Sequence, residues 1–600
     1  MGRKMKKEKN LNKKARLLAH HLRPAAPAFA LGIGASVAVT LLRMAFTQII
    51  RFTVDSALLG DTGTLPAFLA GFDAHALLLT ACAAAAVVSL LQFAAGYVQD
   101  SSLPRGSERF VKSLRDELYR HVQRLPYSWH ASNATGDIIQ RCTADVEVVR
   151  TFISDQVMEL MSTVFLIAVY MGMMLAMNVK MALAALTFIP VIVIYSFLFF
   201  KRASASYTAC DEAEGELSAM VQENLTGVRV VRAFGRERDE LKKFRAKNEK
   251  YTGLWIKLGA MLTNFWTLGD LMSMGQVLTV VLLGVTMCVG GTLSLGTYLA
   301  FVSYTRQLSW PVRALGRVIS EMSKAGVSLD RLLYILESEP EPPCLCPAQA
   351  DLHGDVEFDH VTFAYGQKAV LRDVSFTVPG GGTLGVFGET GSGKSTIALL
   401  LARLYDPEAG AVRIGGVDVR DMDAHALRRG VGVVLQEPFL FSRTLAENIA
   451  ITREDASRAD IERAAQEACL TSAIAEFKDG YDTVVGERGV TLSGGQKQRT
   501  AIARTLLSGA PIMVFDDALS AVDAKTDEAI RGNLRRAAGG STLILIAHRV
   551  ATLMQADTII VLKDGEIVER GTHAELMAMN GLYARAARMQ GAGEEDGHER

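Results

Sequence analysis

The sequence predicts a multi-domain protein in which an all-α six-helix transmembrane domain with long cytoplasmic extensions is followed by an α/β domain. Three observations support this fold class. The N-terminal half contains six apolar stretches of membrane-spanning length, the C-terminal half has an ordinary soluble composition, and a glycine-rich loop in that half stands between a strand-like and a helix-like segment. At 600 residues the chain is also too long for one ordinary domain.

The overall composition argues against one class of partner. Lys and Arg together number 64, and Asp and Glu also number 64, so the formal charges cancel. A nucleic-acid-binding protein is normally basic, and we therefore expect no nucleic-acid partner. The seven cysteines are mostly isolated, and the close pair Cys344 and Cys346 has neither a zinc-site nor a redox spacing. We interpret them as free thiols in a reducing compartment.

Residues 1–23 form a basic segment with nine Lys or Arg residues and one Glu. No small-residue cleavage site follows it, so a signal peptide is not favoured. We interpret the segment as a cytoplasmic tail with an elbow helix from Lys13 to Leu22 that lies on the anionic membrane surface and contacts lipids.

Six apolar stretches within residues 24–336 are each close to the roughly 20 residues that cross a bilayer. The predicted spans are residues 27–50, 76–98, 157–177, 181–200, 265–289 and 295–312. The last span is the weakest, because Thr305, Arg306 and Gln307 interrupt it. The loops that follow the second and the fourth span are rich in Lys and Arg, which places them and both termini in the cytoplasm.

Those two basic segments, residues 101–155 and 201–255, contain few helix-breaking residues. We expect them to continue the membrane helices far into the cytoplasm as paired hairpins. The hairpins are predicted to bend near residues 127–130 and 227–235, where short helices could dock on a soluble domain.

Four polar side chains fall inside the predicted spans, namely Arg43, Gln48, Gln92 and Asp270. Burying an ionisable group in hydrocarbon costs a few kcal/mol. These residues therefore either line a substrate pathway or, for Arg43 and Asp270, lie near an interface and snorkel. The methionine-rich stripe Met171–Met177 either forms an adaptable pocket wall or faces lipid and neighbouring helices. The sequence leaves these alternatives open.

A proline-rich linker at residues 337–352 precedes a soluble domain at residues 353–590 and a polar tail at 591–600. The soluble domain contains a G-x-x-x-x-G-K-[ST] loop. Its glycines let backbone N–H groups point at phosphates, the lysine adds a cation, and the next hydroxyl can hold Mg²⁺. The loop and the residue after it comprise Gly388, Glu389, Thr390, Gly391, Ser392, Gly393, Lys394, Ser395 and Thr396.

The flanking segments agree with a P-loop nucleotide-binding domain, since residues 384–387 predict a buried strand and residues 397–404 a helix. Tyr365 follows a predicted strand and could stack on an adenine ring. Asp516 ends the apolar run at residues 512–515. A carboxylate at the C-terminal end of a buried strand lies where α/β sheets place their ligands, so we expect Asp516 to hold the Mg²⁺ complex.

A second anion site is predicted just before the helix at residues 497–507, in the segment Leu492, Ser493, Gly494, Gly495 and Gln496. Ser493 and the Gly495 N–H would lie at a helix N-terminus, which attracts anions. This segment cannot reach the same phosphate from the same chain without a distant fold-back. A second copy could supply it across an interface.

Together these motifs resemble those of ATP-binding cassette exporters, and the chain is identified as a half-transporter of that family. Residues 388–395 are similar to the family's Walker A motif, residues 512–516 to Walker B and residues 492–496 to the signature. The Q-loop glutamine, the D-loop ends and the switch histidine fall on Gln436, on Ser520 and Asp523, and on His548. Similarity extends to residues 135–141, 225–234 and 485–489 and so covers nearly the whole chain.

The resemblance implies two paired half-transporters that hold two ATP molecules, each between the Walker motifs of one chain and the signature of the other. It also implies that Ser395, Gln436 and Asp516 hold Mg²⁺ and that Asp517, Gln436 and His548 take part in catalysis. Closing this sandwich would open the membrane cavity outward and export a hydrophobic or amphipathic small molecule by alternating access. ATP can drive this change because it has different affinities for the inward-open and the outward-open state.

One residue departs from the family pattern, because Asp517 stands where active members carry Glu. Asp is one methylene shorter, so its carboxylate falls back by roughly 1.5 Å, and a misplacement of about 1 Å can cost on the order of a hundredfold in rate. We therefore predict a site that binds ATP but hydrolyses it slowly. Such a site resembles that of the degenerate-site subunit in heterodimeric bacterial multidrug exporters, whose partner would carry the Glu.

Several alternatives remain. Asp517 could be a tolerated variant in an active homodimer. A non-hydrolytic regulatory or channel subunit is disfavoured by the presence of Gln436 and His548. The cargo could be a lipid, whereas peptide export is disfavoured because no peptidase domain precedes the first span. Short outer loops and a tail without transit-like composition favour the plasma membrane of a bacterium.

Overall fold

The computed structural model describes residues 2–58, 74–342, 344, 347–486, 489, 491–537 and 539–591, which fall into two compact units. The first unit comprises Met1–Arg124 and Asn133–Ser338, and the second comprises Leu125–Ser132 and Glu339–Arg600. The short segment Leu125–Ser132 therefore belongs to the second unit, although the chain on either side of it belongs to the first.

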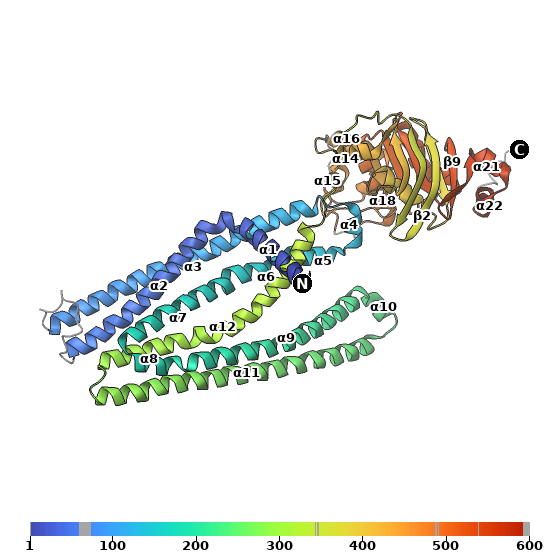
Figure 1. Cartoon of the computed structure of the whole chain (residues 1–600). Helices are drawn as coiled ribbons and strands as arrows, with labels where there is room; N and C mark the ends of the chain where they lie inside the picture. Colours follow the sequence, from blue (N-terminus) through green and yellow to red (C-terminus); the bar gives the residue numbers. More distant parts are fainter. Residues whose placement is uncertain are drawn as a thin grey trace. The chain divides into compact units, whose positions relative to one another are not determined.

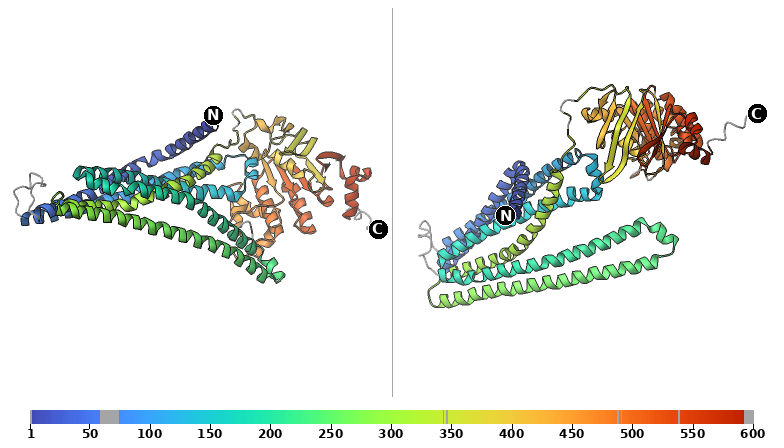
Figure 2. Two further views of the ribbon diagram at one scale, coloured as in Figure 1. Left: turned by 60° about the horizontal axis from the view of Figure 1, so that its bottom comes forward. Right: turned by 45° about the vertical axis from the view of Figure 1, so that its right-hand side comes forward.

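The first unit consists of helices in all its described parts. Two long antiparallel pairs dominate it, α2 with α3 and α9 with α11, and each pair lies side by side in Figures 1 and 2. The helices are α1 (Gly2–Leu22), α2 (Ala26–Phe52), α3 (Ala74–Val122), α5 (Thr135–Gln140), α6 (Val146–Thr151), α7 (Met158–Met177), α8 (Val179–Leu186), α9 (Phe188–Thr226), α10 (Val228–Ala233), α11 (Glu237–Val289) and α12 (Leu295–Leu336). Short 3₁₀ or π-helical turns join some of them: η1 (Arg23–Ala25), η2 (Thr53–Leu58), η5 (Arg141–Asp145) and η6 (Phe152–Val157).

The long helices confirm the predicted cytoplasmic extensions. α3 and α9 continue well past the predicted ends of their spans at residues 98 and 200, and α11 begins well before residue 265. Five helical segments in the described residues are long and apolar enough to cross a membrane: Asn12–Ser56, Ala74–Val122, Thr135–Met177, Val179–Thr226 and Glu237–Val289. α12 is long enough but carries more polar residues, so a sixth span stays a prediction.

Two of the four polar side chains inside the predicted spans, Gln48 and Asp270, have partners within the bundle. Gln48 is buried, and its amide donates a hydrogen bond of 2.7 Å to the Tyr304 hydroxyl. Asp270 accepts a hydrogen bond of 2.5 Å from the Arg313 guanidinium, which also lies over the Trp266 ring. Met174 is completely buried, so this part of the methionine stripe packs against neighbouring helices.

The second unit contains two sheets with helices around them. A four-stranded antiparallel sheet has the order β2-β1-β4-β5, and a six-stranded sheet has the order β10-β9-β3-β8-β7-β6, in which only the β10–β9 pair is antiparallel. The strands are β1 (Val356–Tyr365), β2 (Lys368–Val378), β3 (Thr383–Gly388), β4 (Ala409–Ile414), β5 (Val417–Asp418), β6 (Val431–Val434), β7 (Ile512–Asp516), β8 (Thr542–Ala547), β9 (Thr558–Lys563) and β10 (Glu566–Gly571).

The central parallel strands are apolar throughout because both of their faces are covered. Val514 and Phe515 are neighbours in β7, yet they pack into two different cores on opposite faces of the sheet. The helices of this unit are α4 (Tyr127–Ser132), α13 (Lys394–Leu401), α14 (Ala424–Gly430), α15 (Leu445–Ala450), α16 (Arg458–Glu467), α17 (Thr471–Ala475), α18 (Gly494–Ser508), α19 (Ala524–Ala537), α20 (Val550–Leu553), α21 (His573–Met579) and α22 (Leu582–Met589).

The tip of the first predicted hairpin is the short helix α4, and it packs on the soluble domain. The Tyr127 ring meets the Tyr405 ring edge-on, with centroids 5.5 Å apart. Tyr405 in turn contacts Tyr365 at 5.3 Å. The prediction that this tip is a short helix docked on a soluble domain is confirmed.

A buried carboxylate joins the outer ends of α2 and α12. Asp55, in η2, is fully buried and accepts two hydrogen bonds of 2.7 Å, one from the Gly296 backbone N–H and one from the Ser294 hydroxyl. Ser294 is itself the N-cap of α12. A Cβ atom on Gly296 would lie 2.3 Å from the Arg51 carbonyl oxygen, so only glycine allows this approach.

We expect Asp55→Ala to lower the midpoint of thermal unfolding of the purified protein by several degrees. Hydrogen bonds to a charged group are each worth about 1.5–3 kcal/mol. The variant removes both bonds and leaves the buried Gly296 N–H without its acceptor, whereas the Ser294 hydroxyl can still donate to the Thr297 hydroxyl. Asp55→Asn keeps an oxygen that can accept from the Gly296 N–H and should have a smaller effect. An unchanged midpoint for Asp55→Ala, measured by intrinsic fluorescence, would contradict this role.

Candidate functional site

The glycine-rich loop between β3 and α13 has the conformation that its glycines predict. Gly391 and Gly393 have φ angles of 86° and 99°, in the left-handed region that other residues avoid. A Cβ atom on Gly393 would lie 2.7 Å from the Leu371 side chain and 2.9 Å from the Val370 carbonyl oxygen. The loop therefore closes tightly against β2 and presents its backbone at the N-terminus of α13.

Lys394 turns back onto this loop. Its ammonium group donates hydrogen bonds to the carbonyl oxygens of Gly388 at 2.8 Å and Glu389 at 2.7 Å. Burial lowers the pKa of the Lys394 ammonium, although nearby carboxylates oppose this effect. The Ser392 hydroxyl is buried and has no hydrogen-bond partner among the described residues. A cation, an orphaned hydroxyl and a helix N-terminus thus converge on one small cradle that suits a phosphate group.

β7 delivers two successive carboxylates to the edge of the sheet beside this cradle. All five residues of β7 are buried, and Asp516 at its end is only 4% exposed. Burial raises the pKa of the Asp516 carboxyl, while a hydrogen bond with Ser395 and the charge of Lys394 oppose the rise. The predicted Mg²⁺ ligands Ser395 and Asp516 therefore lie together, and a hydroxyl beside a carboxylate is a donor set that suits Mg²⁺.

The three predicted catalytic residues, Asp517, Gln436 and His548, are in contact with one another through Asp517. Its carboxylate accepts a hydrogen bond of 3.4 Å from the Gln436 amide and lies 2.9 Å from Nδ1 of His548. Its φ angle is 47°, and its N–H donates to the Ile546 carbonyl oxygen at 2.9 Å. Asp is among the few non-glycine residues that enter this backbone region readily. Gln436 and His548 therefore both contact the carboxylate of Asp517.

Tyr365 lies beside the first turn of α13. Its hydroxyl is 3.5 Å from the Thr396 hydroxyl, and 41% of its side chain is exposed. Edge-on contacts with the rings of Phe363 and Tyr405 fix its orientation. This placement leaves an aromatic surface next to the loop.

The second predicted anion site has the expected helix N-terminus. Ser493 is the N-cap of α18 and forms a capping box with Gln496, in which each side chain accepts a hydrogen bond from the other's backbone. Gly495 packs against the segment after β7, since a Cβ atom there would lie 2.9 Å from the Ala521 carbonyl oxygen. Asp523, which ends that segment, accepts a hydrogen bond from the Thr526 N–H and so caps α19.

One functional candidate, Gln498, escaped the sequence analysis. Gln498 is 4% exposed, and its amide donates to the Ser520 hydroxyl at 3.2 Å and accepts from the Ala521 N–H at 3.0 Å. The Ser520 hydroxyl donates in turn to the Asp517 carbonyl oxygen at 2.8 Å. Gln498 therefore links the signature helix to the backbone of the Asp517 segment. The only sequence signal was a second glutamine two residues after Gln496.

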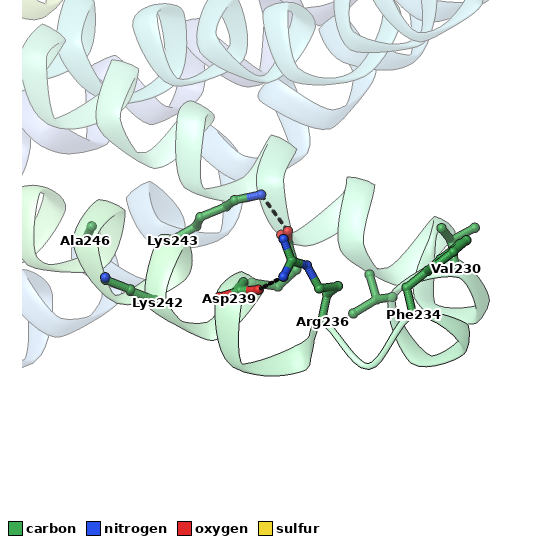
Figure 3. Close-up of a pocket in the computed structure, with 9 residues that line it drawn as sticks. Val230, Phe234, Arg236, Asp239, Lys242, Lys243 and Ala246 are labelled. Atoms are coloured by element: carbon green, nitrogen blue, oxygen red, sulfur yellow. Dashed lines mark hydrogen bonds and ion pairs between the residues drawn. The ribbon is translucent and has the colours of Figure 1, made fainter.

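The second hairpin tip, α10, ends in an exposed apolar surface. Phe234 and Val230 are 76% and 62% exposed. They line a cleft of about 820 Å³ together with charged residues that are paired among themselves, Arg236 with Asp239 and Lys243 with Glu240. Figure 3 shows Arg236 beside Asp239 in this cleft. An apolar patch with a polar rim is typical of a protein interaction site.

Comparison with known proteins identifies the family. A family model described as the ABC transporter transmembrane region matches residues 29–312, and one described as ABC transporter matches residues 371–520. The uncharacterized ABC transporter ATP-binding protein YknU of Bacillus subtilis is 34% identical over 563 residues, which are 93% of this chain and 94% of YknU. The chain belongs to the ABC transporters.

Other relatives of this ABC transporter have more specific names. The probable multidrug resistance protein YheI of Bacillus subtilis is 35% identical over 80% of this chain and 82% of its own length. The ATP-dependent lipid A-core flippase of Desulfotalea psychrophila is 31% identical over 81% of this chain and 86% of its own length. A solved bacterial Atm1-family ABC exporter with ATP bound covers 93% of this chain and 99% of its own, with a TM-score of 0.79 and 28% identity.

These findings confirm the predicted fold class of a helical transmembrane domain followed by an α/β nucleotide-binding domain. They also confirm that this ABC transporter is an integral membrane protein, and its relatives agree with a bacterial inner membrane. The ABC ATPase domain makes it an ATP-dependent transporter. The roles of the individual site residues stay predictions.

We expect Gln498→Leu to lower the kcat of ATP hydrolysis about tenfold while KM for ATP changes little. The substitution keeps the size of the side chain but removes both bonds to the Ser520–Ala521 segment, and a loss of about 1.4 kcal/mol in transition-state stabilisation corresponds to a tenfold slower rate. Thr500→Val is a matched control, because Thr500 is equally buried on α18 and bonds only within its own helix. Equal rates for both variants would contradict the positioning role.

Proposed function

We propose that this ABC transporter is one subunit of a heterodimeric exporter, and that its own Walker site binds ATP but hydrolyses it slowly. The observation that carries this proposal is the identity and setting of Asp517. A short carboxylate stands where active family members carry Glu, and it already bonds to His548 and Gln436.

The geometry supports ATP binding by the predicted residues. The backbone of the glycine-rich loop, Lys394 and the orphaned Ser392 hydroxyl would hold the phosphates, and Tyr365 would stack on the adenine ring. Mg²⁺ would be held by Ser395, Asp516 and Gln436, and it would supply charge neutralisation for the phosphate oxygens. Of these groups only Gln436 bonds to Asp517, so binding should be retained when hydrolysis is slow.

Slow turnover follows from where the Asp517 carboxylate ends. A Glu side chain is longer by one methylene, and a displacement of about 1 Å can cost on the order of a hundredfold in rate. The 2.9 Å contact with Nδ1 of His548 ties the carboxylate to the residue that follows β8. The group would therefore be too far back to orient and deprotonate an attacking water.

The rest of the ATP machinery supports pairing with a second half-transporter. The signature segment has its N-capping geometry intact and would complete the ATP site of a partner that carries Glu after its Walker B Asp. The exposed α10 tip, with Phe234 and Val230, offers a docking surface for a soluble domain. Closure of the nucleotide sandwich would then drive alternating access in the membrane helices.

The relatives support export of hydrophobic or amphipathic cargo, since their names include a probable multidrug resistance protein and a lipid A-core flippase. An active homodimer is the second candidate. It is favoured by the intact set of Gln436, His548 and signature residues, all of which a symmetric transporter would need.

We expect Asp517→Glu to raise the ATPase kcat at least tenfold in an assembled transporter whose partner carries Gln in place of its catalytic Glu, so that only the site of this chain is measured. The purified wild-type chain alone should hydrolyse ATP weakly and yet bind ATP at micromolar to millimolar concentrations. Asp516→Asn is the negative control, because it removes the proposed Mg²⁺ ligand and should not raise the rate. If the lone chain hydrolyses ATP at full rate and Asp517→Glu leaves that rate unchanged, the degenerate site is refuted and the homodimer is favoured.

Co-expression of two differently tagged chains tests the pairing. A Glu-bearing half-transporter encoded beside this chain should co-purify with it and restore ATPase activity, whereas two tagged copies of this chain should co-purify poorly. Efficient pairing of the two copies, with full activity, would instead support the homodimer.

A further inference from the structure

The helix α22 reaches the loop that carries His548 through its C-cap residue, Gln590. The side-chain amide of Gln590 donates a hydrogen bond of 2.9 Å to the His548 carbonyl oxygen and accepts one of 2.8 Å from the Val550 N–H. Gln590 lies 42 and 40 positions further along the chain than these two partners. One distant side chain thus holds the backbone on both sides of Arg549.

This pair of bonds matches the geometry of the backbone that it holds. Arg549 is extended, with φ −97° and ψ 124°. In an extended chain, the carbonyl of one residue and the N–H of the residue two positions later point to the same side. A neighbouring parallel strand pairs with such groups through one residue, and the planar amide of a glutamine carries the same donor and acceptor. A leucine has neither group, and a glutamate lacks the donor.

Gln590 also completes the start of the short helix α20. Val550 is the first residue of α20, and the N-cap Arg549 makes no side-chain hydrogen bond to the helix. The first N–H groups of a helix need acceptors from outside it. Gln590 supplies one of them, and the Val550 side chain is completely buried. The bond to Val550 is therefore a structural one, whereas the bond to the His548 carbonyl oxygen acts on a predicted catalytic residue.

Contacts at the other end of α22 fix the position of this helix. The Glu569 carboxylate of β10 accepts hydrogen bonds from the N–H groups of Leu582 and Tyr583, the latter at 3.1 Å. The Tyr583 side chain is fully buried, and its ring meets the Phe387 ring edge-on with centroids 5.5 Å apart. Phe387 directly precedes the glycine-rich loop. The helix that carries Gln590 is therefore packed against the strand that leads to the phosphate cradle.

The other contacts of the loop are made by its side chains. Nδ1 of His548 lies 2.9 Å from Asp517, and about half of the His548 side chain is exposed. The Arg549 guanidinium donates to the Ser520 carbonyl oxygen at 3.2 Å. A displacement of about 1 Å can cost on the order of a hundredfold in rate, so the position of the His548 backbone matters for the reach of its ring. The bond from Gln590 acts on that backbone directly.

We propose that Gln590 is a positioning residue of the ATP site, which holds the His548 backbone so that the imidazole is presented to Asp517 and to bound ATP. The inference rests on the proposed function, which gives His548 its part in hydrolysis. Gln590 acts through the carbonyl oxygen of His548 and not on the nucleotide itself. The role of α22 is then to support the loop after β8 as well as to cover the core.

The test measures ATP hydrolysis in lipid nanodiscs by an assembled transporter whose partner carries Gln in place of its catalytic Glu, so that only the site of this chain contributes. If the chain pairs with itself, both copies carry each variant. We expect Gln590→Leu to lower kcat about fivefold and to change KM for ATP less than about twofold, because the groups that would hold the phosphates are untouched. Hydrogen exchange of the peptide that contains Val550, followed by mass spectrometry, should become faster because this N–H loses its acceptor.

Gln590→Glu separates positioning of His548 from support of α20. A carboxylate can still accept from the Val550 N–H, but it cannot donate to the His548 carbonyl oxygen. We expect wild-type hydrogen exchange at Val550 together with a kcat as low as that of Gln590→Leu. A purely structural role at the start of α20 predicts a wild-type kcat for this variant. Met589→Ala is the matched control, because Met589 is the neighbouring residue, is 84% exposed, and should leave both readouts unchanged.

The outcomes that overturn the proposal are a wild-type kcat in Gln590→Leu or in Gln590→Glu, a change in KM alone, and an equal loss of kcat in Met589→Ala. Failure of the proposed function gives a different pattern. Full-rate hydrolysis by two copies of this chain, unchanged by Asp517→Glu but lowered by both Gln590 variants, would refute only the degenerate site. Slow hydrolysis that Asp517→Glu accelerates and that neither Gln590 variant changes would refute only the positioning role.

Discussion

The common edge at which the parallel strands β3, β8 and β7 end is the constraint on which the arrangement of the ATP site depends. Asp517 follows β7, and His548 follows the neighbouring parallel strand β8. Because parallel strands end at the same edge of the sheet, residues far apart in sequence meet there without long loops. The glycine-rich loop follows β3, the other neighbour of β8, so the phosphate cradle lies at this same edge. The two cores that bury β7 and β8 thus stabilise the site as well as the domain.

Much of this site could be predicted because its signals are local. The left-handed glycines of the loop, the apolar run that ends at Asp516 and the N-cap Ser493 each act within a few residues of their own position. Gln498 and Asp55 could not be found in this way. Their partners are a D-loop on another element and a helix N-terminus far along the chain. Neither contact leaves a periodicity or a motif in the sequence.

Hydropathy also gives an incomplete account of α12, for a related physical reason. Its polar residues lower the average apolarity, yet in the structure they have partners on other helices. Arg313 bonds to Asp270, Arg317 bonds to Glu159, and Gln307 accepts a hydrogen bond from Tyr170. A hydrogen bond or ion pair within the protein offsets the cost of removing a polar group from water, so a helix of this composition can be covered by its neighbours. The mean hydropathy of one helix cannot include the stabilisation from hydrogen bonds and ion pairs that the helix forms with its neighbours.

The separation of ATP binding from ATP hydrolysis explains how an unequal pair of subunits could still work. The groups that would hold the nucleotide lie on the glycine-rich loop and at Asp516, whereas in the proposed mechanism the rate would depend on the reach of Asp517. A bound ligand shifts a conformational equilibrium by its difference in affinity for the two states, and this shift requires no bond cleavage. A site with a short Asp517 can therefore contribute its full binding energy to closure in every cycle. Hydrolysis at the partner's site alone would then be enough to reopen the pair, provided that this chain's signature residues complete that second site.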